Sequence, residues 1–374
     1  MKSKRKVWLV FIICILLCAH GSISSYAIDP VAEESETIFS TLYDALSPQI
    51  QEILHSIGIE ELNYETLLTL SPQHVFRELF KLLTLKMSAP FHAFLLIVNC
   101  LIFSAVLDHF FASDKKTEPI FSLFITLFSS LCIIKPVLES MTVAFSSMQI
   151  ATAFLFSYIP LFTGLLVAYG KLLTSAAYSN LMLLLSNFLG IIDTKVFFPI
   201  LQCILVLNIV SGIQNNSFFS SISDFFKKAT TMTLTFLSTL FSGLVAIQGN
   251  LAMAGDTVTM RSMKLLIGAT VPIVGGNLSD ACSSLLGSFL LIKNTMGGFS
   301  LLILAILFLP VTIDLLLWKI TLSFLGTICE SLQQSTSQQL FKGVSSTISF
   351  VLSILFFTAF VFIISTGILL HIKS

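Results

Sequence analysis

Residues 261–298 read RSMKLLIGATVPIVGGNLSDACSSLLGSFLLIKNTMGG, and the interpretation of the whole chain depends on this stretch. It is apolar enough for lipid, yet it holds Pro272, Gly275, Gly276, Asn277, Asp280, Lys293 and Asn294. In hydrocarbon a broken helix is tolerated only inside protein or beside a wet cavity, because every backbone N–H and C=O needs a partner. Ionisable side chains at that depth are costly and mark functional pathways. We therefore predict a bundle of membrane-spanning helices built around this interrupted segment.

The composition indicates an integral membrane protein. Of the 374 residues, 55% are hydrophobic and 11% are charged, and the mean hydropathy is +0.94. An average soluble domain has roughly 45–50% apolar and about 25% charged residues. The fold class that we predict is all-α, a polytopic helix bundle in the lipid bilayer. Basic residues form no dense patch, so no nucleic-acid partner is expected.

Residues 1–27 have the pattern of a signal peptide. A basic stretch at 2–6 precedes an apolar stretch at 7–19, and small residues stand at Ser25 and Ala27. This arrangement predicts cleavage after Ala27. An uncleaved anchor is the alternative, although the apolar stretch is shorter than the ~20 residues that a span needs. In either case the next segment is exported.

Residues 28–86 hold ten acidic and three basic side chains. We expect a small helical region outside the cytoplasm. The pair Ser71-Pro72 predicts a helix start, with Ser as the cap and Pro at the first helical position. The amphipathic run that follows would lie along the bilayer surface or pack on the spans.

Residues 87–374 form the multi-span membrane domain. Eight or nine spans are expected, because each candidate is near the ~20 residues required. The candidates are 89–111, 117–139, 147–169, 172–192, 196–213, 229–250, 264–292, 296–318 and 345–370. The interrupted helix at 264–292 either crosses the membrane or re-enters it, and both topologies give the same seven-to-five tally of basic residues in the loops on the two sides. The side of the C-terminus therefore stays open.

A short internal similarity relates two parts of this domain. Residues 160–166 (PLFTGLL) resemble residues 272–278 (PIVGGNL), which makes Pro160 and Gly164 the counterparts of Pro272 and Gly276. Interrupted segments at matching positions of two halves point to a transport site. Seven residues are few, and chance similarity is the alternative.

Asp280 is the acidic residue that we expect to face the interior of the bundle. Lys264, Arg261 or Lys293 would be its basic partner. The neighbouring stripe of small residues would let another helix approach closely, so packing alone is the competing interpretation.

Pro272 and the Gly275-Gly276 pair supply the expected break. Proline removes an intrahelical donor and glycine weakens the next turn. The freed carbonyls, with Asn294 nearby, would suit a polar solute or an ion. A simple kink is the alternative.

No arrangement of residues predicts catalysis, a metal site or a cofactor. The six histidines make no HExxH spacing, and the sequence has no phosphate-binding GxxxxGK[ST] loop and no GxSxG turn. The seven cysteines contain no CxxC pair. We therefore expect a protein that is not an enzyme.

Several motifs resemble the stage III sporulation protein AE family. They are Tyr158-Ile-Pro160, Ser175-Ala-Ala177, Gln248-Gly249, Arg261-Ser-Met-Lys264, Pro272-Ile-Val-Gly275, Asp280-Ala281 and Leu290-Leu-Ile-Lys293-Asn294. The resemblance covers roughly residues 145–370. It implies a role in endospore formation, in the mother-cell membrane that surrounds the forespore. It also implies a channel or secretion-like complex with the sister proteins AA to AH and with stage II sporulation protein Q of the forespore.

The leading hypothesis is thus a membrane component of this channel complex, in one interpretation its permease-like part. One alternative is a stand-alone secondary transporter that uses Asp280 with a basic partner. A further alternative is a scaffold whose spans recruit the other subunits. A homo-oligomer is compatible with each hypothesis.

Overall fold

The computed structural model describes residue 51 and residues 72–110, 118–168, 171–214, 217–270 and 275–371. Regular secondary structure in these ranges is helical throughout, without a strand. The predicted signal peptide with Ala27, and most of the acidic region 28–86, lie outside the described residues. All the described helices belong to one compact unit, Ile38–Ser374.

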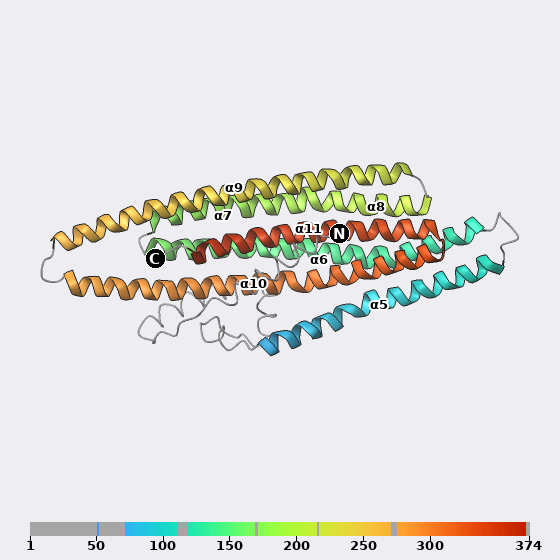
Figure 1. Cartoon of the computed structure of the whole chain (residues 1–374), viewed down its shortest axis with the longest axis horizontal. Coiled ribbons are helices and arrows are strands. Elements are labelled where there is room, and N and C mark those ends of the chain that lie inside the picture. The colour runs from blue at the N-terminus through green and yellow to red at the C-terminus, as the bar shows by residue number, and fades with distance from the viewer. Residues whose placement is uncertain are drawn as a thin grey trace. The chain divides into compact units, whose positions relative to one another are not determined.

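Seven α-helices and one π-helical segment make up the described chain (Figure 1). They are α5 Pro72–Phe110, α6 Glu118–Ala168, α7 Leu172–Ile192, the π-helix η1 Asp193–Phe197, α8 Phe198–Gln214, α9 Ser217–Thr270, α10 Gly275–Ser331 and α11 Ser335–His371. Helix α5 begins at Pro72, as the Ser-Pro pair predicts. The N-terminal part of α5 therefore continues into the first expected span without a break.

Five segments of the described helices are long and apolar enough to cross a membrane. They are Leu83–Val106, Leu123–Val167, Leu172–Gln214, Thr295–Ser331 and Ser335–Ile364. The second has 45 residues, which at ~1.5 Å per residue measures about 68 Å. That is more than twice the ~30 Å thickness of a bilayer core. The chain is thus a helical membrane protein, and the number of eight or nine crossings stays a prediction.

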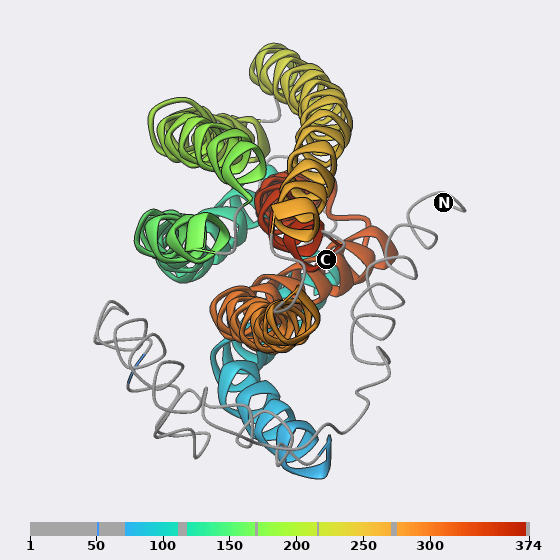
Figure 2. The ribbon, with the colours of Figure 1, turned by 90° about the vertical axis from the view of Figure 1, so that its left-hand side faces the viewer.

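Helix α11 occupies the middle of the described bundle and packs on α10, α8, α6 and α9 (Figure 2). In its most apolar window 61% of the residues are buried, against 22% in α5. Its buried side chains, among them Ile348, Ile354 and Phe357, are not confined to one stripe. Burial on several sides places α11 inside the bundle, whereas an outer helix such as α5 leaves most of its apolar surface exposed.

A tight turn joins α10 to α11 at residues 332–334. The N–H of Gln334 donates to the carbonyl of Cys329 at 2.9 Å, and the N–H of Gln333 donates to that of Glu330 at 3.2 Å. These two bonds define a Schellman cap, which satisfies carbonyls that the end of a helix leaves free. The motif requires a left-handed residue, and here Gln333 has φ 59°. Glycine usually takes this position, so the turn carries strain.

We predict that Gln333→Gly stabilises the protein by about 1 kcal/mol, because a non-glycine residue in the left-handed region costs roughly that amount. The measurement is thermal unfolding in lipid nanodiscs. Gln333→Ala is the matched control; it should change little, since alanine keeps the strain and the Gln333 side chain is exposed. Equal stability of the glycine and alanine variants would show that the turn is relaxed.

Candidate functional site

The residues predicted to line a pathway lie at the end of α9 and in the first half of α10. Arg261 and Lys264 belong to α9, whereas Gly275, Gly276, Asp280, Lys293 and Asn294 belong to α10. Helix α9 ends at Thr270 and α10 begins at Gly275. Pro272 falls between them, outside the described residues. The described contacts do not include these side chains, so their convergence on a pathway stays a prediction.

The proposed repeat counterparts lie in the second half of α6. Pro160 and Gly164 are both exposed, and the helix runs through them to Ala168. A Cβ atom added at Gly164 would have nothing within 4 Å. These two residues therefore face away from the rest of the described bundle.

A polar cluster that the sequence interpretation did not include centres on Asn208 of α8. The Asn208 amide donates to the carbonyl of Gly343 at 3.0 Å and to the hydroxyl of Thr347 at 2.9 Å. Its Oδ1 accepts from the hydroxyl of Ser223 at 2.8 Å. One buried side chain thus joins α8, α9 and α11. Polar side chains that bond across helices are a main source of association within lipid.

Two glycines allow α8 and α11 to approach closely beside this cluster. A Cβ at Gly343 would lie 2.9 Å from the Cβ of Asn208, and a Cβ at Gly212 would lie 2.8 Å from the Cα of Leu340. Small residues at such crossings bring two helix backbones together in the absence of a hydrophobic driving force. The two glycines alternate between the helices, one on each side of the contact.

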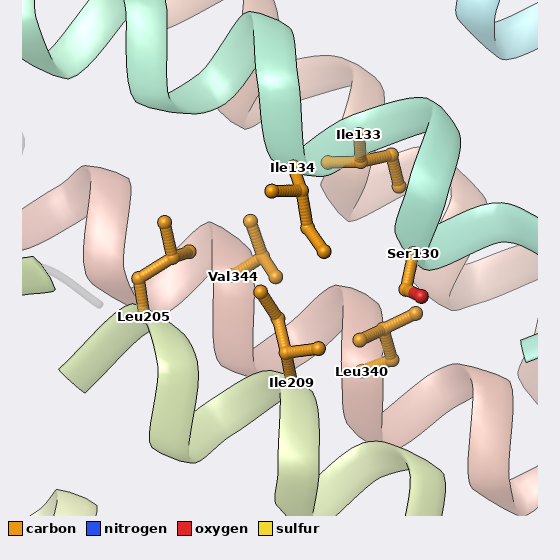
Figure 3. A pocket seen from close by; sticks show the side chains of 7 residues that line it. All are labelled: Ser130, Ile133, Ile134, Leu205, Ile209, Leu340 and Val344. Carbon is orange, nitrogen blue, oxygen red and sulfur yellow. The ribbon is translucent and has the colours of Figure 1, made fainter. Parts of the chain in front are cut away.

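The nearby gap between α6, α8 and α11 is a packed seam. Figure 3 shows its lining, which is Ser130, Ile133 and Ile134 of α6, Leu205 and Ile209 of α8, and Leu340 and Val344 of α11. The gap has no room for a water molecule. Its single hydroxyl, that of Ser130, bonds to the carbonyl of Leu127 at 2.7 Å. The seam contributes to packing, and it is too narrow for a ligand.

The π-helix η1 separates α7 from α8 without interrupting the helical chain. The N–H of Phe198 donates to the carbonyl of Asp193, five residues earlier. Pro199 lies just beyond this turn, where it has no N–H for the carbonyl of Lys195 and its ring would clash with that carbonyl in a regular α-helix. The wider π turn relieves the clash. Single π turns inside α-helices are frequent at functional sites.

Asp193, the first residue of η1, is the buried acid of the described bundle. Its side chain is 1% exposed. Oδ2 accepts a hydrogen bond from the hydroxyl of Thr358 in α11 at 3.0 Å. Oδ1 has no hydrogen-bond partner. A carboxyl group at this depth is costly and indicates function more often than structure.

Helix α6 closes the other side of this site. A Cβ at Gly190, one turn before Asp193, would lie 3.2 Å from a methyl group of Thr152. The rings of Phe145 and Phe198 lie 4.9 Å apart between centroids. These contacts of α6 flank η1 on both sides of Asp193, and Thr358 of α11 bonds to the buried carboxyl group itself.

The predicted spans 172–192 and 196–213 leave residues 193–195 between them, so Asp193 was not among the predicted buried charges. The sequence feature that could have indicated an irregular turn here is Pro199, which lies four residues beyond Lys195 in an apolar run. Asn208 could also have been noticed, since it is a polar amide inside an apolar stretch. Only the packing of α11 shows that both residues face protein.

The family profile of stage III sporulation protein AE matches residues 59–372. This chain belongs to the stage III sporulation protein AE family. The match includes Asn208, Asp193 and the segment 264–292, so these residues lie within the part of the chain that the family profile covers.

A curated relative supports this assignment. The chain is 27% identical over 161 residues to stage III sporulation protein AE of Bacillus subtilis (strain 168). The aligned part is 43% of this chain and 40% of that protein. The chain thus spans well under half the length of the curated relative that it matches. No solved structure matches the chain.

In this family member we predict that Gly212→Ala destabilises the bundle by about 1–3 kcal/mol, the usual cost of overpacking a close contact. The new methyl group meets the backbone of Leu340, which can move away only if α8 and α11 separate. The measurement is thermal unfolding in nanodiscs. Gly243→Ala is the matched control, because a Cβ at Gly243 has nothing within 4 Å. Similar losses in both variants would contradict the close crossing.

Proposed function

We propose that the chain is a membrane component of the channel complex between the mother cell and the forespore, needed for endospore formation. The observation that carries the proposal is the family match over residues 59–372. The membrane-length helices support a membrane location for that role. The relative in Bacillus subtilis carries the same sporulation name.

The proposed location is the mother-cell membrane that surrounds the forespore. The proposed partners are the other stage III sporulation proteins, AA to AH, and stage II sporulation protein Q from the forespore side. The described helices offer them a large apolar outer surface. Exposed side chains on that surface include Phe103, Phe128, Phe236 and Phe324. Lipid covers the part of this surface that partners leave free.

A permease-like part of the complex is the finer version of the proposal. It is supported by polar groups that a simple anchor would not need, notably the Asn208 cluster and the buried Asp193. Buried polar groups in membrane bundles fix helix positions and mark pathways. The predicted break near 271–274, between the helices α9 and α10, is a second place where such a pathway would pass.

A stand-alone secondary transporter is the second candidate. The buried carboxyl of Asp193 favours it, since acids inside transmembrane bundles commonly serve ion-coupled transport. The two candidates differ in whether partners are required. Flux of ions or small solutes through liposomes that contain only this chain would favour the transporter.

We predict that deleting the gene in its native host lowers the yield of heat-resistant spores by orders of magnitude, while growth stays normal. Restoring the full chain with an affinity tag should restore the spores and co-purify the other stage III sporulation proteins from sporulating cells. A tagged, unrelated polytopic membrane protein made at the same time is the control. Full sporulation without the chain would overturn the proposed function.

A further inference from the structure

The carboxyl group of Asp193 lies in a setting that leaves one of its oxygens free. Oδ2 is bonded to the hydroxyl of Thr358, whereas Oδ1 has no partner and the side chain is 1% exposed. The π turn at η1 holds the residue against α6 and α11. Any ligand of Oδ1 must therefore be small enough to reach a buried site.

Among the described residues of the helices around η1, no charged side chain is paired with Asp193. The charged or titratable side chains described there are Cys132, Lys135, Glu139 and Tyr158 of α6, Lys171 at the N-cap of α7, Tyr178 of α7, Lys195 of η1, Cys203 of α8 and Lys342 of α11. None of them forms a described hydrogen bond or ion pair with Asp193. Lys135 pairs with Glu139, Lys342 pairs with Glu330, and Lys195 is exposed.

An isolated carboxylate anion in this site would be expensive by several kcal/mol, because its charge would be stabilised by a single hydrogen bond. A metal cation would need about six oxygen ligands. The described contacts offer the carboxyl group and the hydroxyl of Thr358, which already donates its proton to Oδ2. A proton needs only one acceptor atom, and Oδ1 is such an atom.

We infer that Asp193 is an intramembrane proton-binding site, which takes up a proton from the aqueous phase at Oδ1 and releases it again. Binding forms one O–H bond and converts the carboxylate into a neutral carboxylic acid; release reverses this change. The hydroxyl of Thr358 positions the group by its hydrogen bond to Oδ2. The site links η1 to the central helix α11, so a change in its protonation acts on the contact between them.

Infrared spectroscopy of the full chain in liposomes tests this inference directly. The C=O stretch of a protonated carboxyl lies well above the carboxylate bands, which allows a single acid to be followed. We expect such a band in the unmodified chain, its loss in Asp193→Asn, and its disappearance at high pH. The band should shift in D₂O, because the proton exchanges with solvent.

Three variants separate this site from a structural role. Ser186→Ala removes another buried hydroxyl of α7 that has no partner, and it should leave the band unchanged. Asp314→Asn, in the half-exposed part of α10, should also leave it unchanged. Thr358→Val removes the donor to Oδ2, so it should keep the band and move it to higher frequency.

Three results would overturn the inference. The first is the absence of any protonated-carboxyl band that Asp193→Asn removes, and the second is a band that neither D₂O nor high pH changes. The third is a band that responds to Na⁺ or K⁺ at constant pH, which would assign the site to a metal cation instead. These measurements use the chain alone, so their failure would leave the proposed sporulation role untouched.

Discussion

Polar groups in an apolar bundle must find their partners within the protein, and α11 supplies such partners to α6, η1, α8 and α10. The hydroxyl of Ser337 bonds to Thr126 of α6, and that of Ser345 bonds to Ser323 of α10. The carbonyl of Gly343 and the hydroxyl of Thr347 accept hydrogen bonds from Asn208 of α8, and the hydroxyl of Thr358 donates to Asp193 of η1. Each contact satisfies a group that lipid could not satisfy. The position of α11 at the centre is therefore specified by polar bonds as well as by apolar burial.

The segment around Pro199 relates the need for internal polar partners to the proton binding that we infer at Asp193. Pro199 directly follows the π turn that contains Asp193, Thr358 bonds to the Asp193 carboxyl group, and we infer that this enclosed group binds a proton. The same principle governs the predicted break near Pro272 in the other half of the chain, where freed carbonyls would again need partners. A membrane component that moves solutes, or that responds to a gradient, needs polar groups of this kind inside its bundle.

The sequence predicts the helical membrane class well, because composition and the length of apolar runs determine it. The start of α5 at Pro72 was also predictable, since proline has a fixed place in the first turn of a helix. The Schellman turn at Gln333 was not, because the residue expected there is glycine. The ends of the spans are harder still: residues 193–195 have the composition of a loop, yet they continue the helix from α7 into α8.

The candidate site also has residues that the sequence predicts and residues that it does not. Ionisable and helix-breaking residues inside apolar runs, such as Asp280 and Pro272, can be found by reading the chain. The contacts of Asn208 could not be found in this way, because they depend on Ser223 and on Gly343, which is 135 residues away in the chain. Close approach at Gly212 likewise has no local signal, since glycines in an exposed helix look the same in sequence.

The most direct measurement is disulfide cross-linking in native membranes between cysteines placed at positions 193 and 358, in a chain whose seven native cysteines are replaced. The account predicts rapid cross-linking within the chain, together with protection of a single cysteine at 193 from membrane-impermeant thiol reagents. A pair at 164 and 358 should not cross-link, because Gly164 has no neighbour within reach. Free reaction of position 193 with such reagents, and no cross-link to 358, would show an ordinary loop and contradict the account.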